Sequence, residues 1–123
     1  MAAHNILGQK GEEVAVRYLL QKGYVIRHRN WKKGHFELDI VAAKASELVV
    51  IEVKTRRNTN FALPQDAVTE KKIKRTVWAA NAYIKLFRLD MPVRFDIITV
   101  VGQEGNFHIE HMEEAFCSPV CVC

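Results

Sequence analysis

The 123-residue sequence contains no long run of apolar side chains. A helix needs about 20 consecutive apolar residues to cross a bilayer, and no stretch approaches that length. Residues 1–11 also lack the apolar core of a signal peptide. Internal repeats, low-complexity segments and evident linkers are missing as well. These absences, with a length typical of one domain, predict a single-domain cytoplasmic protein.

Cysteine is scarce, and the three that occur crowd into the last seven residues. An odd number at one terminus is not a disulfide framework, and it is compatible with a reducing compartment. A zinc site would need a fourth ligand, such as His108 or His111. The simpler interpretation is one folded domain over residues 1–116 and a tail with free thiols over residues 117–123. The cysteines of this tail are Cys117, Cys121 and Cys123.

Basic side chains exceed acidic ones, with a formal net charge of +4 and a pI of about 9.1. This mild excess permits a polyanionic partner without requiring one. The basic residues cluster at 27–33, 54–57 and 71–75. Such clusters are either phosphate- and base-contacting surfaces or solvated strand ends and helix faces. The residues that we expect to contact nucleic acid are Arg27, Arg29, Trp31, Lys32, Lys33, Arg56, Arg57 and Lys71.

The spacing of apolar residues predicts two helices. The first runs to Gln21, and Gly23 just past its end suits the left-handed residue that often terminates a helix. The second spans about residues 65–88, with Thr69 as a possible N-cap partway along it. Its two aromatic side chains are expected in the core or in an interface; they are Trp78 and Phe87.

Five segments have the pattern of strands. One begins at residue 24, and the next two, 35–42 and 48–54, are joined by a short polar turn that predicts an antiparallel hairpin. The nearly all-apolar run in the third segment predicts a central strand with both faces covered. Two more strands, 93–101 and 107–111, follow the second helix. The order of elements predicts an α/β or α+β layer fold around a mixed sheet flanked by helices.

Two acids and a lysine stand out on this hairpin. Asp39 lies on one strand, and Glu52 and Lys54 share a face of the next because they are two residues apart. Charged groups that leave a buried strand need solvent, a partner or a metal. Hydrolysis of a phosphodiester needs an activated water and positive charge beside the phosphate, and Mg²⁺ (or Mn²⁺) bound by carboxylates supplies both. Asp39, Glu52 and the Val53 carbonyl would be the ligands of such an ion. Lys54 would then lie beside the scissile phosphate or orient the attacking water.

A third acid can complete this site. Glu12 lies on the first helix at a spacing that shares a face with Ala15 and Leu19, so it is aimed inward. Its alternative role is that of an ordinary first-turn acid. Glu37 shares a strand face with Asp39, and it is either a site residue or a solvated edge residue. Because a Glu-x-Lys triplet alone is a weak signal, the combination with these other acids carries the hypothesis.

Alternation along the second strand predicts the environment of its apolar residues. Phe36, Leu38 and Ile40 are expected on one face, and Asp39 on the opposite one. Phe36 is therefore expected to face the core.

Several short motifs, among them Glu37-Leu38-Asp39-Ile40-Val41 and Val50-Ile51-Glu52-Val53-Lys54-Thr55-Arg56, recur in one order along the chain. With these motifs the sequence resembles the YraN family of small, endonuclease-like bacterial proteins that are mostly uncharacterised. The motifs occur in the family order from the first helix to the fourth strand, and the cysteine-containing tail lies outside them. One local departure is His35-Phe36 before Glu37, where the family usually has glycine. The matching pieces are Gly11-Glu12 with Ala15 and Tyr18-Leu19; Gly23-Tyr24; Arg29-Asn30; Glu37-Leu38-Asp39-Ile40-Val41; Val50-Ile51-Glu52-Val53-Lys54-Thr55-Arg56; Ala67-Val68 with Lys71; and Arg94-Phe95-Asp96.

The resemblance implies a restriction-endonuclease-like core, close to that of archaeal Holliday-junction resolvases. In that wider group a helix-borne Glu, a strand Asp and a Glu-x-Lys unit form the site. It further implies a metal-dependent endonuclease acting on DNA, with branched or junction DNA as a candidate substrate and a homodimer by analogy. The alternative is a module that binds nucleic acid or a protein without cleavage. The catalytic roles fall on Glu12, Asp39, Glu52 and Lys54.

Overall fold

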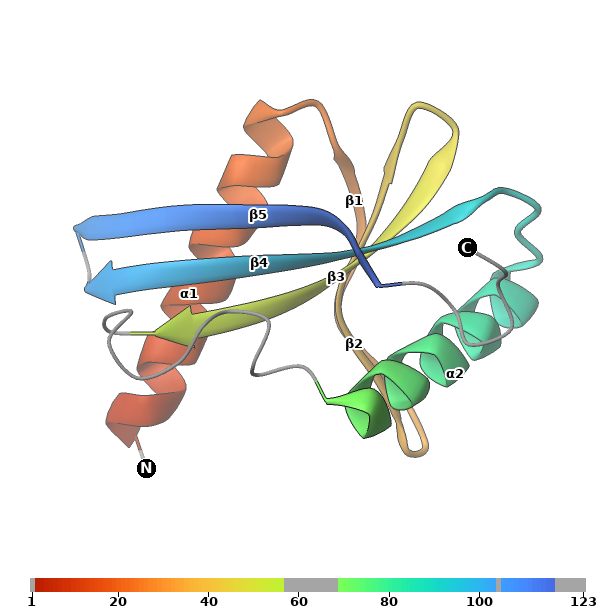
Figure 1. Ribbon diagram of the computed structural model, residues 1–123, viewed down its shortest axis with the longest axis horizontal. Coiled ribbons are helices and arrows are strands. Elements are labelled where there is room, and N and C mark those ends of the chain that lie inside the picture. Colours follow the sequence, from red (N-terminus) through yellow and green to blue (C-terminus); the bar gives the residue numbers. More distant parts are fainter. Residues whose placement is uncertain (1, 57–68, 104, 117–123) are drawn as a thin grey trace.

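The computed structural model describes residues 2–56, 69–103 and 105–116. In these ranges the chain forms one five-stranded sheet, in the order β1-β2-β3-β4-β5, with a helix packed on each face (Figure 1). No helix among these residues is long and apolar enough to cross a membrane. The elements are α1 (Ala2–Gln21), β1 (Val25–Lys33), β2 (Phe36–Lys44), β3 (Glu47–Arg56), α2 (Glu70–Phe87), β4 (Val93–Gln103) and β5 (Asn106–Phe116).

β2 and β3 form the antiparallel hairpin that the sequence predicts. Both turn residues, Ala45 and Ser46, have positive φ angles of 52° and 65°, as a two-residue turn of type I′ requires. The pairing of the two strands ends at Ile40 opposite Ile51, at the end of the hairpin away from this turn. β3 then pairs in parallel with β4, so the sheet is mixed, as predicted.

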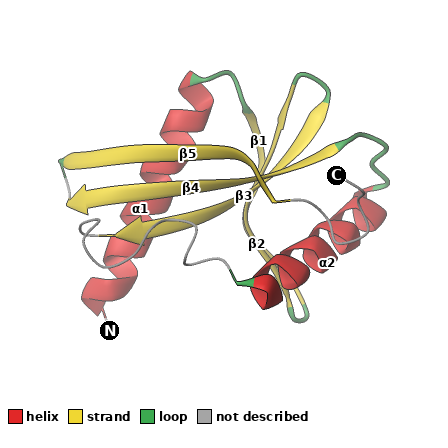
Figure 2. Cartoon of the chain, in the orientation of Figure 1, coloured by secondary structure: helices red, strands yellow, loops and turns green. Residues whose placement is uncertain are grey.

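The central position of β3 follows from its alternating side chains. Val49 and Ile51 pack in the apolar cluster beneath α1, whereas Leu48 and Val50 pack in the cluster that contains α2. Figure 2 shows the two helices on opposite sides of the yellow sheet. Both faces of β3 are therefore covered, as predicted. The α/β fold is confirmed, and it is consistent with a restriction-endonuclease-like core.

Two glycines allow α1 to end and to pack closely on the sheet. Gly23 follows the helix with φ of 89°, which confirms the predicted left-handed terminator. Gly11 lies against the end of β3, where a Cβ atom would collide with the side chain of Thr55. The absence of a side chain at position 11 therefore lets α1 approach the end of β3.

α2 and β5 differ most from their predicted ranges, and the other strands differ at their ends by one or two residues. α2 begins at Glu70, and Thr69 is its N-cap, with the hydroxyl oxygen accepting a hydrogen bond from the N–H of Lys72 at 3.1 Å. Residues 65–68 of the predicted helix lie outside the described residues. β5 is 11 residues long and pairs with most of β4, whereas the sequence predicted only residues 107–111. One face of β5 is largely exposed, so its outer part lacks the apolar pattern that marks a strand. The tail predicted over residues 117–123 lies outside the described residues.

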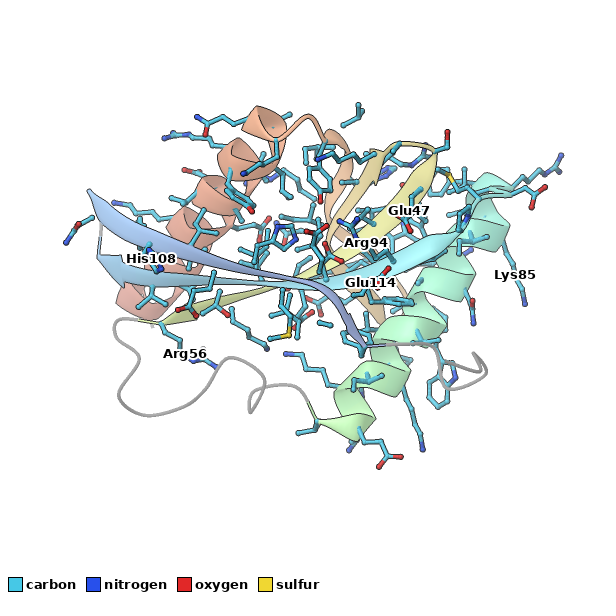
Figure 3. The ribbon with its side chains drawn as sticks, turned by 45° about the horizontal axis from the view of Figure 1, so that its top comes forward. Glu47, Arg56, Lys85, Arg94, His108 and Glu114 are labelled. Carbon is cyan, nitrogen blue, oxygen red and sulfur yellow. The ribbon has the colours of Figure 1, made fainter. Side chains whose placement is uncertain are left out.

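A buried carboxylate on β4, that of Asp96, forms an ion pair within its own strand and hydrogen bonds to β5. The Asp96 carboxylate is fully buried and accepts two hydrogen bonds of 2.9 Å from the Arg94 guanidinium. His111 Nε2 lies 2.7 Å from the same carboxylate, and the N–H of Glu114 donates to it at 3.1 Å. Burial alone would raise the pKa of Asp96, but its hydrogen bonds from His111 and Arg94 hold that pKa below its usual value. Figure 3 places Arg94 between Glu47 and Glu114 near the middle of the sheet.

Candidate functional site

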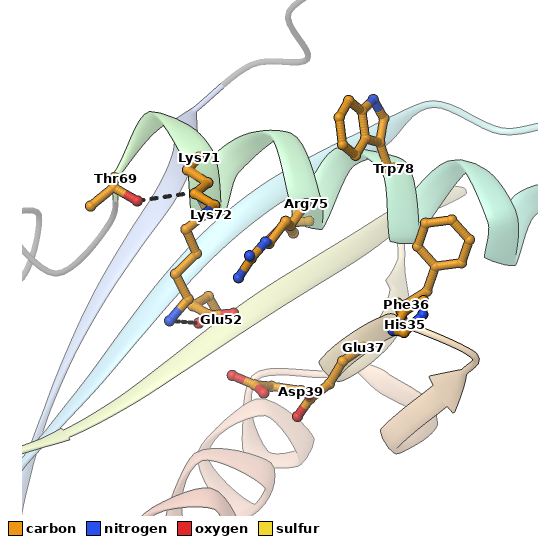
Figure 4. Close-up of a pocket in the computed structure, with 11 residues that line it drawn as sticks. His35, Phe36, Glu37, Asp39, Glu52, Thr69, Lys71, Lys72, Arg75 and Trp78 are labelled. Carbon is orange, nitrogen blue, oxygen red and sulfur yellow. Dashed lines mark hydrogen bonds and ion pairs between the residues drawn. The ribbon is translucent and has the colours of Figure 1, made fainter.

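An open pocket of about 850 Å³ lies between α2 and the beginning of β2 (Figure 4). Its deepest acidic groups are Asp39 on β2 and Glu52 on β3, and its other walls carry basic and aromatic side chains. The residues that line it are His35, Phe36, Glu37, Asp39, Glu52, Thr69, Lys71, Lys72, Arg75, Thr76 and Trp78.

The open end of the hairpin positions the two acids. Asp39 and Glu52 are the next residues beyond the last β2–β3 pair, Ile40 opposite Ile51. The N–H of Val53 donates a 2.9 Å hydrogen bond to Asp39 Oδ2 instead of to a β2 carbonyl. Because the N–H and C=O of one strand residue point to the same side, the Val53 carbonyl also faces β2. The structure therefore brings together the three groups that the sequence predicts as metal ligands.

The electrostatics of Asp39 show that negative charge is crowded here. Burial, and after it the nearby Glu52 carboxylate, raise the pKa of Asp39 from its ordinary value to about 7. The Val53 N–H opposes this shift, and the more distant Glu12 adds to it. A group with this pKa is only partly ionised near neutral pH. A cation placed between the two carboxylates would relieve their repulsion and favour the ionised form.

Two lysines neutralise Glu52. Its Oε1 lies 3.2 Å from the Nζ of Lys54 and 2.7 Å from the Nζ of Lys72. Burial lowers the pKa of Lys54, and the neighbouring Lys72 lowers it further. Burial also acts to lower the pKa of Lys72, but its contacts with Glu52 and Lys54 raise it overall. Lys54 thus occupies the predicted position, and Lys72 joins the site from α2.

Lys72 was not among the predicted site residues. The sequence places it within a basic cluster whose simplest interpretation is a solvated helix face. The one usable signal is Thr69, because an N-cap there fixes which residues form the first turn of α2. That turn lies over the pocket in Figure 4, with Lys72 directed toward Glu52.

Glu12 lies beside this centre rather than within it. Its Oε1 accepts a 2.8 Å hydrogen bond from Asn30 Nδ2 and lies 3.6 Å from Arg29 Nε. Asn30 has φ of 51° and lies opposite Asp39, between two regular β1–β2 pairs. A left-handed asparagine in a strand is uncommon, and such residues often occur at functional sites. The sequence predicts no role for Asn30 beyond its place in the Arg29-Asn30 motif. In the structure its hydrogen bond holds Glu12 near Asp39.

The donor set fits Mg²⁺ or Mn²⁺ better than a metal that needs several protein side chains. Within the described ranges, no group of three His, Cys, Asp or Glu side chains could hold a metal ion. Mg²⁺ commonly uses one or two carboxylates and completes its shell with water and phosphate oxygens. Asp39, Glu52 and the Val53 carbonyl match that smaller set of oxygen ligands.

Trp31 is a core residue. Its side chain is 9% exposed, and its ring packs edge to face against Tyr83 with centroids 5.2 Å apart. The expectation that Trp31 stacks nucleic-acid bases does not agree with this burial. The neighbouring Arg27 is exposed, yet its Nε donates to the Tyr83 hydroxyl at 3.0 Å. The Trp31 side chain therefore packs β1 against α2 and is not available on the surface to bind nucleic acid.

The other predicted nucleic-acid contacts occupy different places. Lys71 lines the pocket. Arg56, at the end of β3, is half-buried, and its Nη1 donates to the Thr55 carbonyl at 3.0 Å. Arg57 lies outside the described residues. The remaining cations are exposed along β1; they are Arg29, Lys32 and Lys33.

Phe36, which was expected to face the core, and Trp78, which was expected in the core or in an interface, are both exposed in the pocket wall. Phe36 is 38% exposed, and Trp78 is 58% exposed. Leu38 packs in the α2 cluster, whereas Ile40 packs in the α1 cluster, so these strand residues do not share one face. The left-handed Asn30 opposite Asp39 interrupts the regular pairing at this point, and simple alternation fails there.

The comparisons with known proteins identify a family. The sequence profile of the "Uncharacterised protein family UPF0102" matches residues 11–100, a segment that includes all four predicted catalytic residues. UPF0102 proteins of Bacteroides fragilis and Bacteroides thetaiotaomicron are 68% and 67% identical over 120 residues, which are 98% of this chain and 99% of each relative. UPF0102 protein FP2501 of Flavobacterium psychrophilum is 47% identical over 116 residues, 94% of this chain and 98% of the relative. These names state a family and no reaction.

Proposed function

We propose that this chain, which belongs to the uncharacterised protein family UPF0102 that is also called YraN, is a metal-dependent endonuclease that hydrolyses DNA phosphodiester bonds. One observation carries the proposal. Asp39 and Glu52 converge at the open end of the hairpin, with the Val53 peptide group beside them and a lysine pair on Glu52. Paired carboxylates with an adjacent cation are the groups that metal-assisted phosphodiester hydrolysis uses.

Each group has a distinct role in this proposal. Mg²⁺ or Mn²⁺, when bound, supplies positive charge to the phosphate and lowers the pKa of a water molecule. Asp39 and Glu52 would hold the ion, and the Val53 N–H fixes the orientation of Asp39. Lys54 lies 3.2 Å from Glu52 and so remains beside the reacting phosphate as a point charge. Glu12 assists from the edge of the site by adding negative charge near Asp39.

The surroundings of the acids favour a polyanionic substrate. Lys71 and Arg75 line the pocket and are both exposed to solvent. Exposed cations bind a phosphate backbone in a salt-dependent manner. The carboxylates of Asp39 and Glu52 would repel that backbone unless a bound metal ion neutralises them. Branched or junction DNA and a homodimer remain predictions from the resemblance. Size-exclusion chromatography with light scattering, with and without DNA, tests the dimer.

One observation favours the alternative, a nucleic-acid- or protein-binding module without catalysis. Glu52 is already neutralised by Lys54 and Lys72, so the pocket is electrostatically satisfied there without a metal. In that case Asp39→Asn should leave DNA affinity unchanged, and neither protein should cut. A failure to bind DNA even at low salt would favour a protein partner.

A cleavage assay tests the nuclease proposal. Wild type and Glu52→Gln are incubated with supercoiled plasmid and with a labelled four-way junction, in Mg²⁺, Mn²⁺ or chelator. Glu110→Gln is the matched control, because Glu110 is an exposed acid on β5 that does not line the pocket. The proposal predicts cutting that needs metal, persists in Glu110→Gln and disappears in Glu52→Gln. Metal-independent cutting, or equal cutting by Glu52→Gln, would contradict it.

A further inference from the structure

Two aromatic rings at the pocket contribute to neither apolar core. Trp78 on α2 is 58% exposed, and Phe36 at the start of β2 is 38% exposed. Neither is a member of the clusters that pack α1 and α2 on the sheet. Both line the pocket, and Figure 4 draws their rings at the same end of it, away from Thr69. Aromatic side chains that line a pocket together with a few charged groups are typical of sites that bind a ligand with an apolar face.

The chemical order along the pocket matches that of a nucleotide. Carboxylates that would hold a metal lie at Asp39 and Glu52, and the cations Lys71 and Arg75 line the same pocket. The exposed rings of Phe36 and Trp78 complete its wall. A nucleotide has a charged phosphate at one end and a flat base at the other. The pocket volume of about 850 Å³ is within the size range of small-molecule sites, which is compatible with a bound nucleotide.

We propose that Trp78 and Phe36 stack an unpaired nucleobase, so that the substrate is single-stranded DNA or an unpaired segment within a larger DNA. This inference rests on the proposed nuclease function and names its substrate class. A base inside a duplex is covered on both faces by its neighbours, and its π-face is not available to a protein ring. An unpaired base exposes that face, and aromatic side chains bind it with little dependence on sequence.

The intrinsic fluorescence of the protein provides a direct readout. The chain has two tryptophans, of which Trp31 is buried and Trp78 is exposed at the pocket. A twelve-nucleotide single strand and a blunt duplex of the same sequence are titrated in chelator, so that no cleavage occurs. We expect the single strand to quench the fluorescence of wild type, and the duplex to have little effect. In Trp78→Ala this quenching should be lost.

Affinities from anisotropy of labelled DNA test the contribution of each ring. Trp78→Ala and Phe36→Ala should each weaken single-strand binding by roughly fivefold to a hundredfold, the range for loss of one stacked base. Their duplex affinity should change by less than about twofold, since phosphate contacts remain. Trp78→Tyr should retain most of the affinity. Leu86→Ala is the matched control, because Leu86 is 48% exposed on the same helix but does not line the pocket.

Equal loss of single-strand and duplex affinity, or the same loss in Leu86→Ala, would overturn the stacking proposal. So would a fluorescence change that depends on protein concentration without DNA, because a second copy would then cover the rings. Cleavage rates give a further test. If cleavage depends on metal but Trp78→Ala keeps the wild-type ratio of single-strand to duplex rates, the stacking proposal is contradicted and the nuclease proposal is not. Conversely, intact single-strand quenching without any cleavage supports the base site and contradicts only the nuclease.

Discussion

The Nζ of Lys72 lies 2.7 Å from Oε1 of Glu52, closer than the Nζ of Lys54, which lies at 3.2 Å. Lys72 comes from α2 and Glu52 from β3, so this contact joins the helix to the proposed metal ligand. The Lys72 side chain is 37% exposed, so solvent reaches it at the pocket, where a substrate phosphate would also lie under the proposed function. In the proposed enzyme, a metal ion and Lys72 would therefore compete for the same carboxylate.

Removing this competitor should strengthen metal binding. Lys72→Gln is expected to bind Mn²⁺ about tenfold more tightly than wild type, because a positive charge next to the ligand is lost. Cleavage should nevertheless fall, since the phosphate loses a cation. Calorimetry with Mn²⁺ and a single-turnover cleavage rate measure the two effects. Lys74→Gln is the control, because Lys74 pairs with Glu70 on the outer face of α2; equal metal affinity in all three proteins would refute the competition.

The raised pKa of Asp39 predicts how stability depends on pH. Burial, then the charge of Glu52, raises that pKa from 3.8 to about 7. Between these values the folded state retains a proton that the unfolded state has lost, so stability falls as pH rises through this window. Asp39→Asn stays neutral and should therefore be more stable than wild type by about 1–3 kcal/mol at pH 8, with little difference near pH 4.

Urea unfolding of the metal-free protein at both pH values measures this difference. Glu37→Gln is the control, because Glu37 is an exposed acid of the same strand that also lines the pocket. If the free energies of unfolding of wild type and Asp39→Asn differ by the same amount at pH 4 and at pH 8, the pKa of Asp39 is not raised in the folded protein.

Asn30 should serve both stability and catalysis, and two substitutions separate these roles. Asn30→Ala places an ordinary side chain at φ of 51° and should cost about 1 kcal/mol of stability. Asn30→Gly tolerates that backbone and should retain stability. Both variants remove the 2.8 Å hydrogen bond to Glu12, so cleavage should drop about tenfold in each. Thermal unfolding and cleavage rates measure the two effects, and full activity in Asn30→Gly would show that Glu12 needs no such support.

Asp96 should matter for stability rather than for chemistry. Asp96→Ala leaves Arg94 without its buried partner and should cost about 3–5 kcal/mol. Because the folded pKa of Asp96 lies below 3.8, its contribution is complete above the unfolded pKa and is lost as pH falls through the folded value. Chemical denaturation at pH 7 compares this variant with Glu110→Gln, an exposed acid on β5. A loss below about 1 kcal/mol would contradict a structural role for this ion pair.

The order and pairing of most elements could be predicted because local signals agree with the final packing. The apolar run from Leu48 to Ile51 fills both cores, and the short turn at Ala45 and Ser46 permits only a hairpin. The length of β5 could not be predicted, since an edge strand with one exposed face carries a weak apolar pattern. Its extent depends on pairing with β4, which is a long-range interaction.

In the site, too, the residues placed by local structure could be predicted, and those placed by long-range packing could not. Asp39 and Glu52 could be placed together because a hairpin fixes which residues of two strands are neighbours. Lys72 could not, because its contact depends on how α2 crosses the sheet. Trp31, which was expected to contact nucleic acid, is buried, and Trp78, which was expected in the core or in an interface, is exposed. Both lie near basic residues, and composition alone does not distinguish a buried ring from a surface ring.

Mn²⁺ binding to wild type, Asp39→Asn, Glu52→Gln and the double variant, measured by calorimetry, tests most directly whether Asp39 and Glu52 share one metal ion. The account predicts one site in wild type, a loss of affinity of at least tenfold in each single variant, and little further loss in the double variant. Equal Mn²⁺ affinity in wild type and in both single variants would contradict it.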